Sequence, residues 1–231
     1  MNQVKIVAYT QAKTSAFENI EGGEEDFIAY CARVSNPGNQ NNTKTAPKLL
    51  AYLIKNKHWS PFEMASVTME ITTTRDISRQ ILRHRSFSFQ EFSQRYAQAN
   101  TFEVREARLQ DPTNRQNSVR VDRGLAEQRL IDEKFTMAQH KVIRLTREAY
   151  ECALDSGIAK EQARSILPLT VYTQVWWTAS FQSIMNFIEL RDEATAQVEI
   201  QEYARSLKKI MLEIFPETTK LWQEVYWDSS E

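Results

Sequence analysis

Glycine and proline are scarce in this chain of 231 residues, which contains only 5 Gly and 6 Pro. Flexible linkers between domains are built largely from such residues, so we expect residues 1–231 to form a single domain. A glycine-rich phosphate loop is also missing, which argues against a Rossmann or P-loop origin for any nucleotide binding.

Cysteine is equally rare. Cys31 and Cys152 stand far apart and neither belongs to a Cys-x-x-Cys pair, so we expect neither a disulfide framework nor a bound metal. Both lie among apolar residues, and we interpret both as inert core residues. The sequence shows no signal peptide and no run near the roughly 20 apolar residues of a membrane span. It therefore predicts a cytoplasmic protein without membrane contact.

An excess of charge of one sign is absent too. Lys and Arg number 29 against 30 Asp and Glu, which gives a formal net charge of -1. Nucleic acids and anionic lipids are attracted by an extended positive field, so we expect neither as a partner. Any anion must bind at a local site.

Hydrophobic periodicity predicts strands interleaved with longer helices, without a repeat. Strands are expected at residues 4–9, 65–74 and 169–177, and helices at 24–34, 48–55, 76–85, 131–152, 180–190 and 195–214. This pattern indicates an α+β fold, with a mixed or antiparallel sheet packed against long helices. At least one of Trp176 and Trp177 should be in the core.

The longest predicted helix carries an apolar row with steps of four and three. Its members are Ile131, Phe135, Ala138, Val142, Leu145, Ala149 and Cys152. Such a row serves either a core seam or a helix pair between subunits, and we favour the core seam.

Arginine is concentrated between residues 75 and 95. Five Arg stand there, at positions 75, 79, 83, 85 and 95, against Asp76 and Glu91. A guanidinium group is a rigid fork of donors that matches phosphate and carboxylate oxygens. Ser, Gln and Phe residues follow the cluster, and together they indicate a pocket for a phosphorylated, planar heterocycle. The alternative is a solvated helix face with surface ion pairs.

The spacing of residues in this segment resembles that of a known family. Arg83-His84-Arg85, seven further residues and then Ser93 reproduce the RHR-x7-S signature of flavin-dependent thymidylate synthases. Similar landmarks are His58-Trp59-Ser60-Pro61-Phe62-Glu63, Arg164-Ser165-Ile166-Leu167-Pro168-Leu169 and Met185-Asn186-Phe187. The resemblance covers most of the chain.

This resemblance implies a homotetramer with active sites shared between subunits and FAD lying over bound dUMP. It implies FAD contacts from His58, Ser60, Arg83, His84, Arg85, Glu91, Ser180, Gln182 and Asn186. It implies dUMP contacts from Gln80, Arg83, Glu91, Phe92, Ser93, Gln94, Arg95, Arg164 and Arg191. Ser180 and Gln182 stand where many members have Asn and Arg, and Thr195 stands where they have His. The first two can still donate hydrogen bonds to FAD.

In similar enzymes NADPH reduces the flavin, and 5,10-methylenetetrahydrofolate donates the carbon that becomes the methyl group. We assign to Arg191 the catalytic role of stabilising negative charge on the N3/O4 edge of uracil, which makes C5 nucleophilic. Arg95 and Arg164 suit the phosphate of dUMP. Neither cysteine is placed for the thiolate attack used by the other class of thymidylate synthase.

Two other hypotheses remain open for the arginine-rich segment. One is a non-catalytic nucleotide- or nucleic-acid-binding module, and the other is a different flavoenzyme on the same scaffold. A bound flavin argues against the first, and methyl transfer to dUMP argues against the second.

Overall fold

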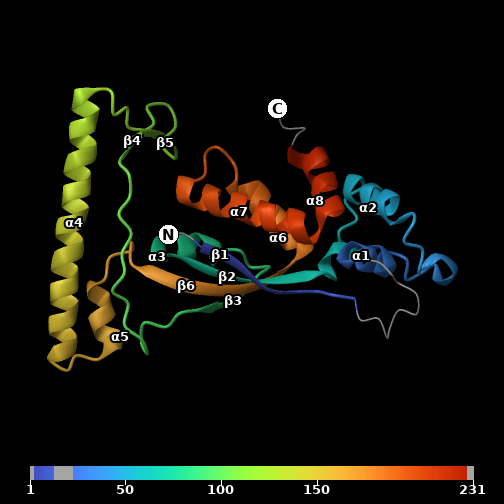
Figure 1. Ribbon diagram of the computed structural model, residues 1–231, viewed down its shortest axis with the longest axis horizontal. Coiled ribbons are helices and arrows are strands. Elements are labelled where there is room, and N and C mark those ends of the chain that lie inside the picture. The colour runs from blue at the N-terminus through green and yellow to red at the C-terminus, as the bar shows by residue number, and fades with distance from the viewer. Residues whose placement is uncertain (1–2, 13–22, 228–231) are drawn as a thin grey trace.

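The structure is a computed structural model that describes residues 3–12 and 23–227 (Figure 1). The strands are β1 (Gln3–Tyr9), β2 (Ser66–Thr74), β3 (Ser88–Glu91), β4 (Arg108–Gln110), β5 (Ser118–Arg120) and β6 (Tyr172–Ser180). The α-helices are α1 (Glu24–Ala32), α2 (Ala46–Lys55), α3 (Arg75–Ile81), α4 (Ala126–Asp155), α5 (Lys160–Ala163), α6 (Phe181–Arg191), α7 (Val198–Ile214) and α8 (Pro216–Trp222). Short turns of other helix types are η2 (Pro37–Asn39), η3 (Ser60–Glu63), η4 (Arg164–Ile166) and η5 (Gln223–Trp227). The expected α+β architecture is confirmed.

β2 and β6 form the centre of an antiparallel sheet whose strand order is β1-β2-β6-β3. They pair in continuous register from Ser66 opposite Ser180 to Thr74 opposite Tyr172. On β2, Val67, Met69 and Ile71 alternate inward and are buried, whereas the residues between them are partly exposed. β-Branched and apolar side chains suit such a half-covered pleated surface. The strands predicted at 4–9 and 65–74 are confirmed.

The strand predicted at 169–177 is shifted by three residues, because β6 runs from Tyr172 to Ser180. The residues after Pro168 first make a turn, in which the Val171 N–H donates to the Pro168 carbonyl (3.0 Å). Backbone groups used in this turn are not free for the ladder. At its other end, Ser180 caps α6, since its Oγ accepts a hydrogen bond from the Ser183 N–H (3.2 Å).

α3 and α6 leave opposite ends of the central strand pair. α3 follows Thr74 and α6 follows Ser180, which lie at opposite ends of the β2–β6 ladder. Both helices bury apolar side chains in the same core, so they run back over the same face of the sheet. At about 1.5 Å per residue they are about 10 and 16 Å long, against about 30 Å for the strands. Their C-terminal ends therefore meet.

The core lies between the sheet and helices α1, α2, α6, α7 and α8 (Figure 1). Trp177 on β6 is buried, and its Nε1 donates to the Tyr203 hydroxyl of α7 (2.8 Å). Trp222 of α8 packs against Trp59 with ring centroids 4.7 Å apart. Trp176 points to the opposite face of the sheet and is exposed. The expectation that at least one of the paired tryptophans is in the core is confirmed.

Two helices have an end near the site that differs from the predicted one: the C-terminal end of α3 and the N-terminal end of α7. α3 ends at Ile81 and does not continue to residue 85, because the His84 N–H bonds the Ile81 carbonyl (3.1 Å) and turns the chain toward β3. α7 begins at Val198 and not at Thr195. There the side-chain amide of Gln201 donates to the carbonyl of Ala196 (2.6 Å) and holds the preceding residues in a loop.

α4 stands apart from the sheet, at the left of Figure 1. Its predicted apolar row is open to solvent in this chain, with Phe135 44%, Val142 51% and Leu145 47% exposed. The buried residues of α4 are Thr146 and Tyr150, on another side of the helix. The prediction of a core seam is therefore wrong, because helical periodicity locates an apolar stripe without identifying what covers it.

Both cysteines are free in the structure. Cys31 is half-buried on α1, and burial raises the pKa of its thiol, which fits an unreactive residue. Cys152 is exposed on α4, so its interpretation as a core residue is wrong. Across residues 3–12 and 23–227, no helix combines the length and apolar character needed to cross a bilayer. In the same part of the chain, no three His, Cys, Asp or Glu side chains are grouped to hold a metal ion.

Arg105 joins the segment before β4 to α3, α4 and α7. Its guanidinium donates to Asp76 of α3 (2.5 and 2.9 Å) and to Glu103 (2.8 Å), and Glu199 of α7 lies 3.6 Å away. Its backbone exchanges two hydrogen bonds with the side chain of Gln139 on α4 (both 2.9 Å). Since the Arg105 side chain is only 16% exposed, this network is largely shielded from water.

Replacing Arg105 with Ala should lower the free energy of unfolding by about 2–4 kcal/mol, because Asp76 and Glu103 would retain poorly solvated charges without a cation. Urea unfolding followed by circular dichroism measures the change. Arg144→Ala is the matched control, since Arg144 is 63% exposed and its ion pair is to Glu148. That change should cost less than about 0.5 kcal/mol beyond helix propensity. Equal losses for the two variants would contradict the role given to Arg105.

Candidate active site

The basic triplet lies in the loop that follows α3. Arg83, His84 and Arg85 connect the end of α3 to β3, and the Phe87 N–H donates to the His84 carbonyl (3.1 Å), which closes the loop. Consecutive residues of such a loop point in different directions. Arg83 and Arg85 are exposed, whereas His84 turns inward.

The His84 imidazole is held where α3 and α6 meet. Its ring contacts Phe187 and Phe87, with centroids 4.6 and 5.7 Å apart. Its Nε2 accepts a hydrogen bond from Nε of Arg191 (3.1 Å). Arg191 Nη2 also donates to the Gln80 carbonyl (3.3 Å) near the end of α3, where helix carbonyls lack intrahelical partners and attract cations. Arg191 thus joins the ends of both helices.

Burial and the charge of Arg191 lower the pKa of His84 to about 4. The ring is therefore neutral at pH 7, and because Nε2 accepts a hydrogen bond, its hydrogen resides on Nδ1. Burial and the charge of Arg83 also lower the pKa of Arg191, although a guanidinium keeps its charge at neutral pH. The site combines neighbouring guanidinium groups with a neutral imidazole.

Some arginines of the cluster have carboxylate partners and others have none. Arg75 pairs with Glu91 (2.9 Å) and Arg95 with Glu161 (3.1 Å), but only the second pair lies at the surface, so the surface ion-pair hypothesis holds for Arg95 alone. Arg79, Arg83, Arg85 and Arg191 form no ion pair with any described residue. Neighbouring cations without carboxylates repel one another, and a bound anion would relieve that repulsion. The end of α3 is therefore suited to an anionic ligand.

α6 carries three of the predicted FAD contacts. Ser180 is its N-cap, and Gln182 and Asn186 lie one turn apart on the same side of the helix. Asn186 is exposed, so its amide is open to a ligand. Arg191, at the end of the helix, lies on the side of Phe187, since both contact His84.

Two predicted FAD contacts, His58 and Ser60, precede β2, and Ser60 lies beside the start of α6. Ser60 is the first residue of η3, where Phe62 packs on Phe181 with ring centroids 5.8 Å apart. His58 follows Lys57, whose φ of 58° ends the turn after α2, and its exposed ring meets Tyr52 edge-on at 5.9 Å. The structure thus brings Ser60 near α6 and leaves His58 at the surface.

Glu91 lies on the other flank of α3 and is occupied by contacts within the chain. Its carboxylate accepts hydrogen bonds from Ser78 (2.9 Å) and Thr173 (3.2 Å) and pairs with Arg75 (2.9 Å). Phe92 follows, half-buried, and its N–H donates to the Gln174 carbonyl (2.8 Å). These contacts fix the direction in which the chain leaves β3.

Arg95 and Arg164 come together through Glu161. Glu161 accepts from Arg95 Nε with its carboxylate (3.2 Å) and from Arg164 Nε with its backbone carbonyl (3.2 Å). Both arginines are exposed. Ser93 and Gln94 precede Arg95, and the buried Nε2 of Gln94 has no hydrogen-bond partner among the described residues. An orphaned buried donor next to paired guanidinium groups fits a site completed by a ligand.

The predicted site residues thus form two separate groups in one chain. The first, the α3-end group, consists of Gln80, Arg83, His84, Arg85 and Arg191. The second, the β3-end group, consists of Glu91, Phe92, Ser93, Gln94, Arg95 and Arg164. In the residues that the structure describes, no hydrogen bond or ion pair joins the two groups. Ser78 bonds Glu91 on the flank of α3, whereas Arg191 binds at its C-terminal end.

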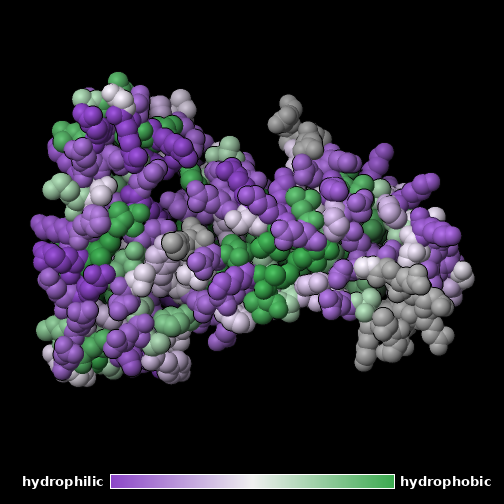
Figure 2. Space-filling model, in the orientation of Figure 1, coloured by the Kyte–Doolittle hydropathy of each residue, from purple (hydrophilic) through white to green (hydrophobic). Residues whose placement is uncertain are grey.

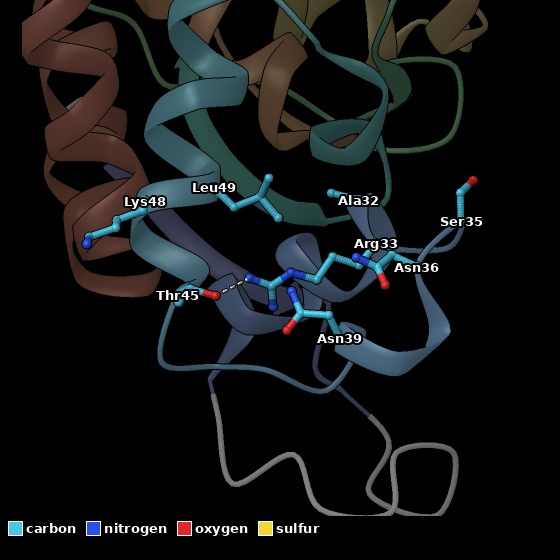
Figure 3. A pocket seen from close by; sticks show the side chains of 8 residues that line it. All are labelled: Ala32, Arg33, Ser35, Asn36, Asn39, Thr45, Lys48 and Leu49. Carbon is cyan, nitrogen blue, oxygen red and sulfur yellow. Dashed lines mark hydrogen bonds between the residues drawn. The ribbon is translucent and has the colours of Figure 1, made fainter.

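A cavity of about 470 Å³ opens between α1 and α2, away from both groups (Figure 3). Arg33 points into it and is fixed by hydrogen bonds to Thr45 (2.8 Å) and to the Asn42 carbonyl. Lys48 also lines it. None of the residues that the sequence assigned to FAD or dUMP lines this cavity.

Sequence reasoning missed four residues that shape the groups. Phe87 and Phe187 form the wall against His84, Gln197 accepts from Gln80 (2.7 Å), and Glu161 bridges the two exposed arginines. Phe187 belongs to a landmark of the motif, which is a signal that could have found it. The contacts of Gln197 with Gln80 and of Glu161 with Arg95 join residues far apart in sequence, and no local pattern reports them.

Fold and site together define a class of protein. The protein has an antiparallel sheet covered by helices, and at the end of α3 it has a group of Arg and His side chains lined by aromatic rings. Such a group suits an anionic ligand, as in a nucleotide-binding enzyme.

Comparison with known proteins narrows the class. The sequence profile of the family described as Thymidylate synthase complementing protein matches residues 18–217. The chain is 47% identical over 196 residues to the flavin-dependent thymidylate synthase of Synechocystis sp., covering 83% of this chain and 86% of that protein. It is 46% identical over 199 residues to the probable flavin-dependent thymidylate synthase of Paramecium bursaria Chlorella virus 1, covering 85% and 89%. The chain belongs to the flavin-dependent thymidylate synthase family.

A solved structure shares the fold. The UMP/dUMP methylase PolB from Streptomyces cacaoi, crystallised with 5-Br dUMP, superposes with a TM-score of 0.80 at 25% sequence identity. The match covers 98% of this chain and 96% of that one.

The His84 imidazole should titrate near pH 4 in the folded protein, and Arg191→Ala should raise this pKa while leaving it below the ordinary value of 6.5 because burial remains. Imidazole chemical shifts followed by NMR over a pH series measure both values. Arg144→Ala, far from the ring on α4, is the control and should leave the titration unchanged.

The same pKa sets a pH window for stability. Because the folded pKa of His84 lies below the ordinary value of 6.5, its contribution is present above pH 6.5 and is lost as the pH falls toward 4. A His84→Gln variant should lose less stability over this window than the parent protein. A native titration near 6.5 would overturn the buried, Arg191-bonded geometry.

Proposed function

We propose that this protein methylates dUMP to dTMP, with 5,10-methylenetetrahydrofolate as carbon donor and FAD, reduced by NADPH, as hydride carrier. The observation that carries the proposal is the α3-end group, in which Arg83 and Arg191 stand without carboxylates beside the neutral His84. Relatives at 46 and 47% identity bear the name of this activity, and the likeness to a dUMP methylase supports the substrate.

The residues present fit FAD. Its pyrophosphate is an anion that suits the guanidinium groups of Arg83 and Arg85, and its ring system needs polar partners such as α6 offers. Asn186 and Gln182 supply amide donors and acceptors along that helix. When bound and reduced, FAD supplies the hydride that completes the methyl group.

The β3-end group fits the phosphate of dUMP. Arg95 and Arg164 are exposed and both contact Glu161, Arg95 through the carboxylate and Arg164 through the backbone carbonyl, so a phosphate can replace the carboxylate at Arg95 with Arg164 nearby. The orphaned amide of Gln94 and the hydroxyl of Ser93 add neutral donors. In this proposal Arg and polar side chains hold the nucleotide, and no cysteine of this chain acts as a nucleophile.

Arg191 is the catalytic residue of the proposal. Its Nε is held by His84 and one Nη by the Gln80 carbonyl, which leaves other N–H groups of the guanidinium for a ligand. A positive charge fixed against N3 and O4 of uracil stabilises negative charge there and makes C5 more nucleophilic. Because His84 is neutral, it holds Arg191 in place without adding a competing charge.

The two separate groups support an active site shared between subunits of a homotetramer. Within one chain, Glu91 lies on the flank of α3 and Arg191 at its C-terminal end, with no hydrogen bond or ion pair between the groups in residues 23–227. A uracil nucleotide spanning Arg191 and Arg95 would then take one residue from each of two chains. In this proposal residues 1–231 form one domain, which works in the cytoplasm with its cysteines free.

The protein should form dTMP from dUMP in an anaerobic mixture with FAD, NADPH and 5,10-methylenetetrahydrofolate, and omission of FAD should abolish it. Chromatography of the nucleotides measures the product. Binding of both FAD and dUMP without dTMP would favour a different flavoenzyme on this scaffold. Salt-sensitive binding of single-stranded nucleic acid, without flavin, would favour the non-catalytic binding module.

Subunit mixing should reveal the shared site. Arg191→Ala and Arg95→Ala should each reduce kcat or kcat/KM on the order of 10²–10³-fold. After the two variants are co-expressed and reassembled, activity should return in roughly a quarter of sites if subunits mix at random, because one chain contributes Arg191 and another Arg95.

The matched control pairs Arg191→Ala with Gln80→Ala. Both residues belong to the α3-end group of the same chain, so no mixed site is wholly native, and the mixture should show no more activity than the mean of the two variants measured separately. Recovery in the control, or none in the first mixture, would exclude sites divided between the two groups.

A further inference from the structure

The apolar row of α4 is an unoccupied surface in the single chain. Phe135, Val142 and Leu145 are all exposed by more than two fifths, and Ala138, Ala149 and Cys152 continue the row along the helix. Figure 2 shows apolar side chains interrupting the polar surface over this helix. Monomeric proteins seldom expose an aligned row of this kind, and it indicates a protein contact.

The row is not needed to attach α4 to its own chain. That attachment uses a neighbouring side of the helix, where Asp132 accepts from the Ala107 N–H (3.2 Å) and Gln139 binds the backbone of Arg105. Thr146 and Tyr150 are buried on that side as well. Ile131 and Phe135 also border a cleft of about 500 Å³ against the start of α7, and the row is exposed from Ala138 to Cys152.

The charged residues along one edge of the apolar row change sign along the helix, and this order identifies the partner. At steps of seven, one edge of the row carries Lys134, Lys141, Glu148 and Asp155, all exposed. The first half of this edge is positive and the second half negative. A helix with this order is complementary to itself when turned end for end, since each Lys then meets an acidic residue.

We propose that α4 pairs with α4 of a second copy of this chain, antiparallel about a twofold axis that passes between Ile143 and Arg144. In this register Lys141 and the partner subunit's Glu148 lie on the same edge with an axial offset of about 3 Å, as do Lys134 and the partner subunit's Asp155, and their side chains are long enough to span it. The proposal rests on the homotetramer of the proposed function and assigns one of its interfaces.

The same register aligns the apolar layers. Val142 faces the partner subunit's Leu145, and Phe135 faces the partner subunit's Cys152. Ala138 faces the partner subunit's Ala149, and small residues there allow the helices to approach closely. One alignment thus satisfies the charged edge and the apolar row together, as an isologous interface requires.

Thiol cross-linking tests the register. Phe135→Cys, treated with a short bis-maleimide, should give a covalent dimer through the partner subunit's native Cys152. Residues 135 and 152 of one helix are about 25 Å apart, so the short reagent cannot join them within a chain. Met137→Cys is the matched control, because Met137 is 70% exposed and lies off the row, and it should give no dimer. Phe135→Cys with Cys152→Ala should also give none.

Charge reversal tests the same register without a reagent. Lys141→Glu places an acid near the partner subunit's Glu148 at two symmetry-related positions, and should weaken assembly on the order of tenfold or more. Lys141→Glu with Glu148→Lys restores complementarity and should restore assembly, apart from the small effect of losing the exposed Arg144–Glu148 ion pair. Sedimentation over a dilution series measures assembly, and circular dichroism confirms that each variant is folded.

The outcomes separate this inference from the proposed function. A cross-link with Phe135→Cys and rescue by the double reversal establish the helix pair whether or not dTMP forms. A folded Phe135→Cys protein that gives no cross-linked dimer, or gives no more than Met137→Cys, overturns the pairing even if the wild-type chain forms dTMP. Failure of the double reversal to restore assembly also overturns this register.

Discussion

The continuous antiparallel pairing of β2 with β6 is the constraint on which the rest of the structure depends. Its register places Thr74 and Ser180 at opposite ends of the central ladder, and α3 and α6 begin there. Both helices must cover the same apolar face of the sheet, so they run toward each other until their ends meet. The contact of His84 with Phe187, and the bond from Arg191 to the Gln80 carbonyl, follow from that meeting.

The electrostatics of the site follow from how its charges are partnered. The guanidinium of Arg105 is neutralised by Asp76 and Glu103. At the end of α3, Arg191 instead has a neutral imidazole and a helix carbonyl as partners. Such partners orient a cation without cancelling its charge, which keeps the charge available for an anion. An acidic residue at position 84 would hold Arg191 equally well but would neutralise it.

Two features of the single chain stand out. The α3-end and β3-end groups share no hydrogen bond or ion pair among the described residues, and the apolar row of α4 is exposed. Both features have the same physical explanation if the functional unit contains several chains, since surfaces and half-sites left open in one subunit are covered by another. The order of charges beside the row supports this, because it is complementary to its own reverse.

The sequence by itself determined the local features of this protein. Alternation on β2, the N-cap at Ser180 and the arginine-rich motif are written in neighbouring residues, so propensity and spacing predicted them. Whole-chain similarity then determined the family. Only the tertiary structure decided that His84 turns inward to Arg191, that Glu91 is held by Ser78 and Arg75, and that the row of α4 lies outside the core. These depend on contacts between residues up to about a hundred positions apart, as the bond of Arg191 to His84 illustrates with a separation of 107 residues. Periodicity shows that a stripe is apolar, but what covers it is decided by packing, and the packing of the described residues leaves the row of α4 exposed.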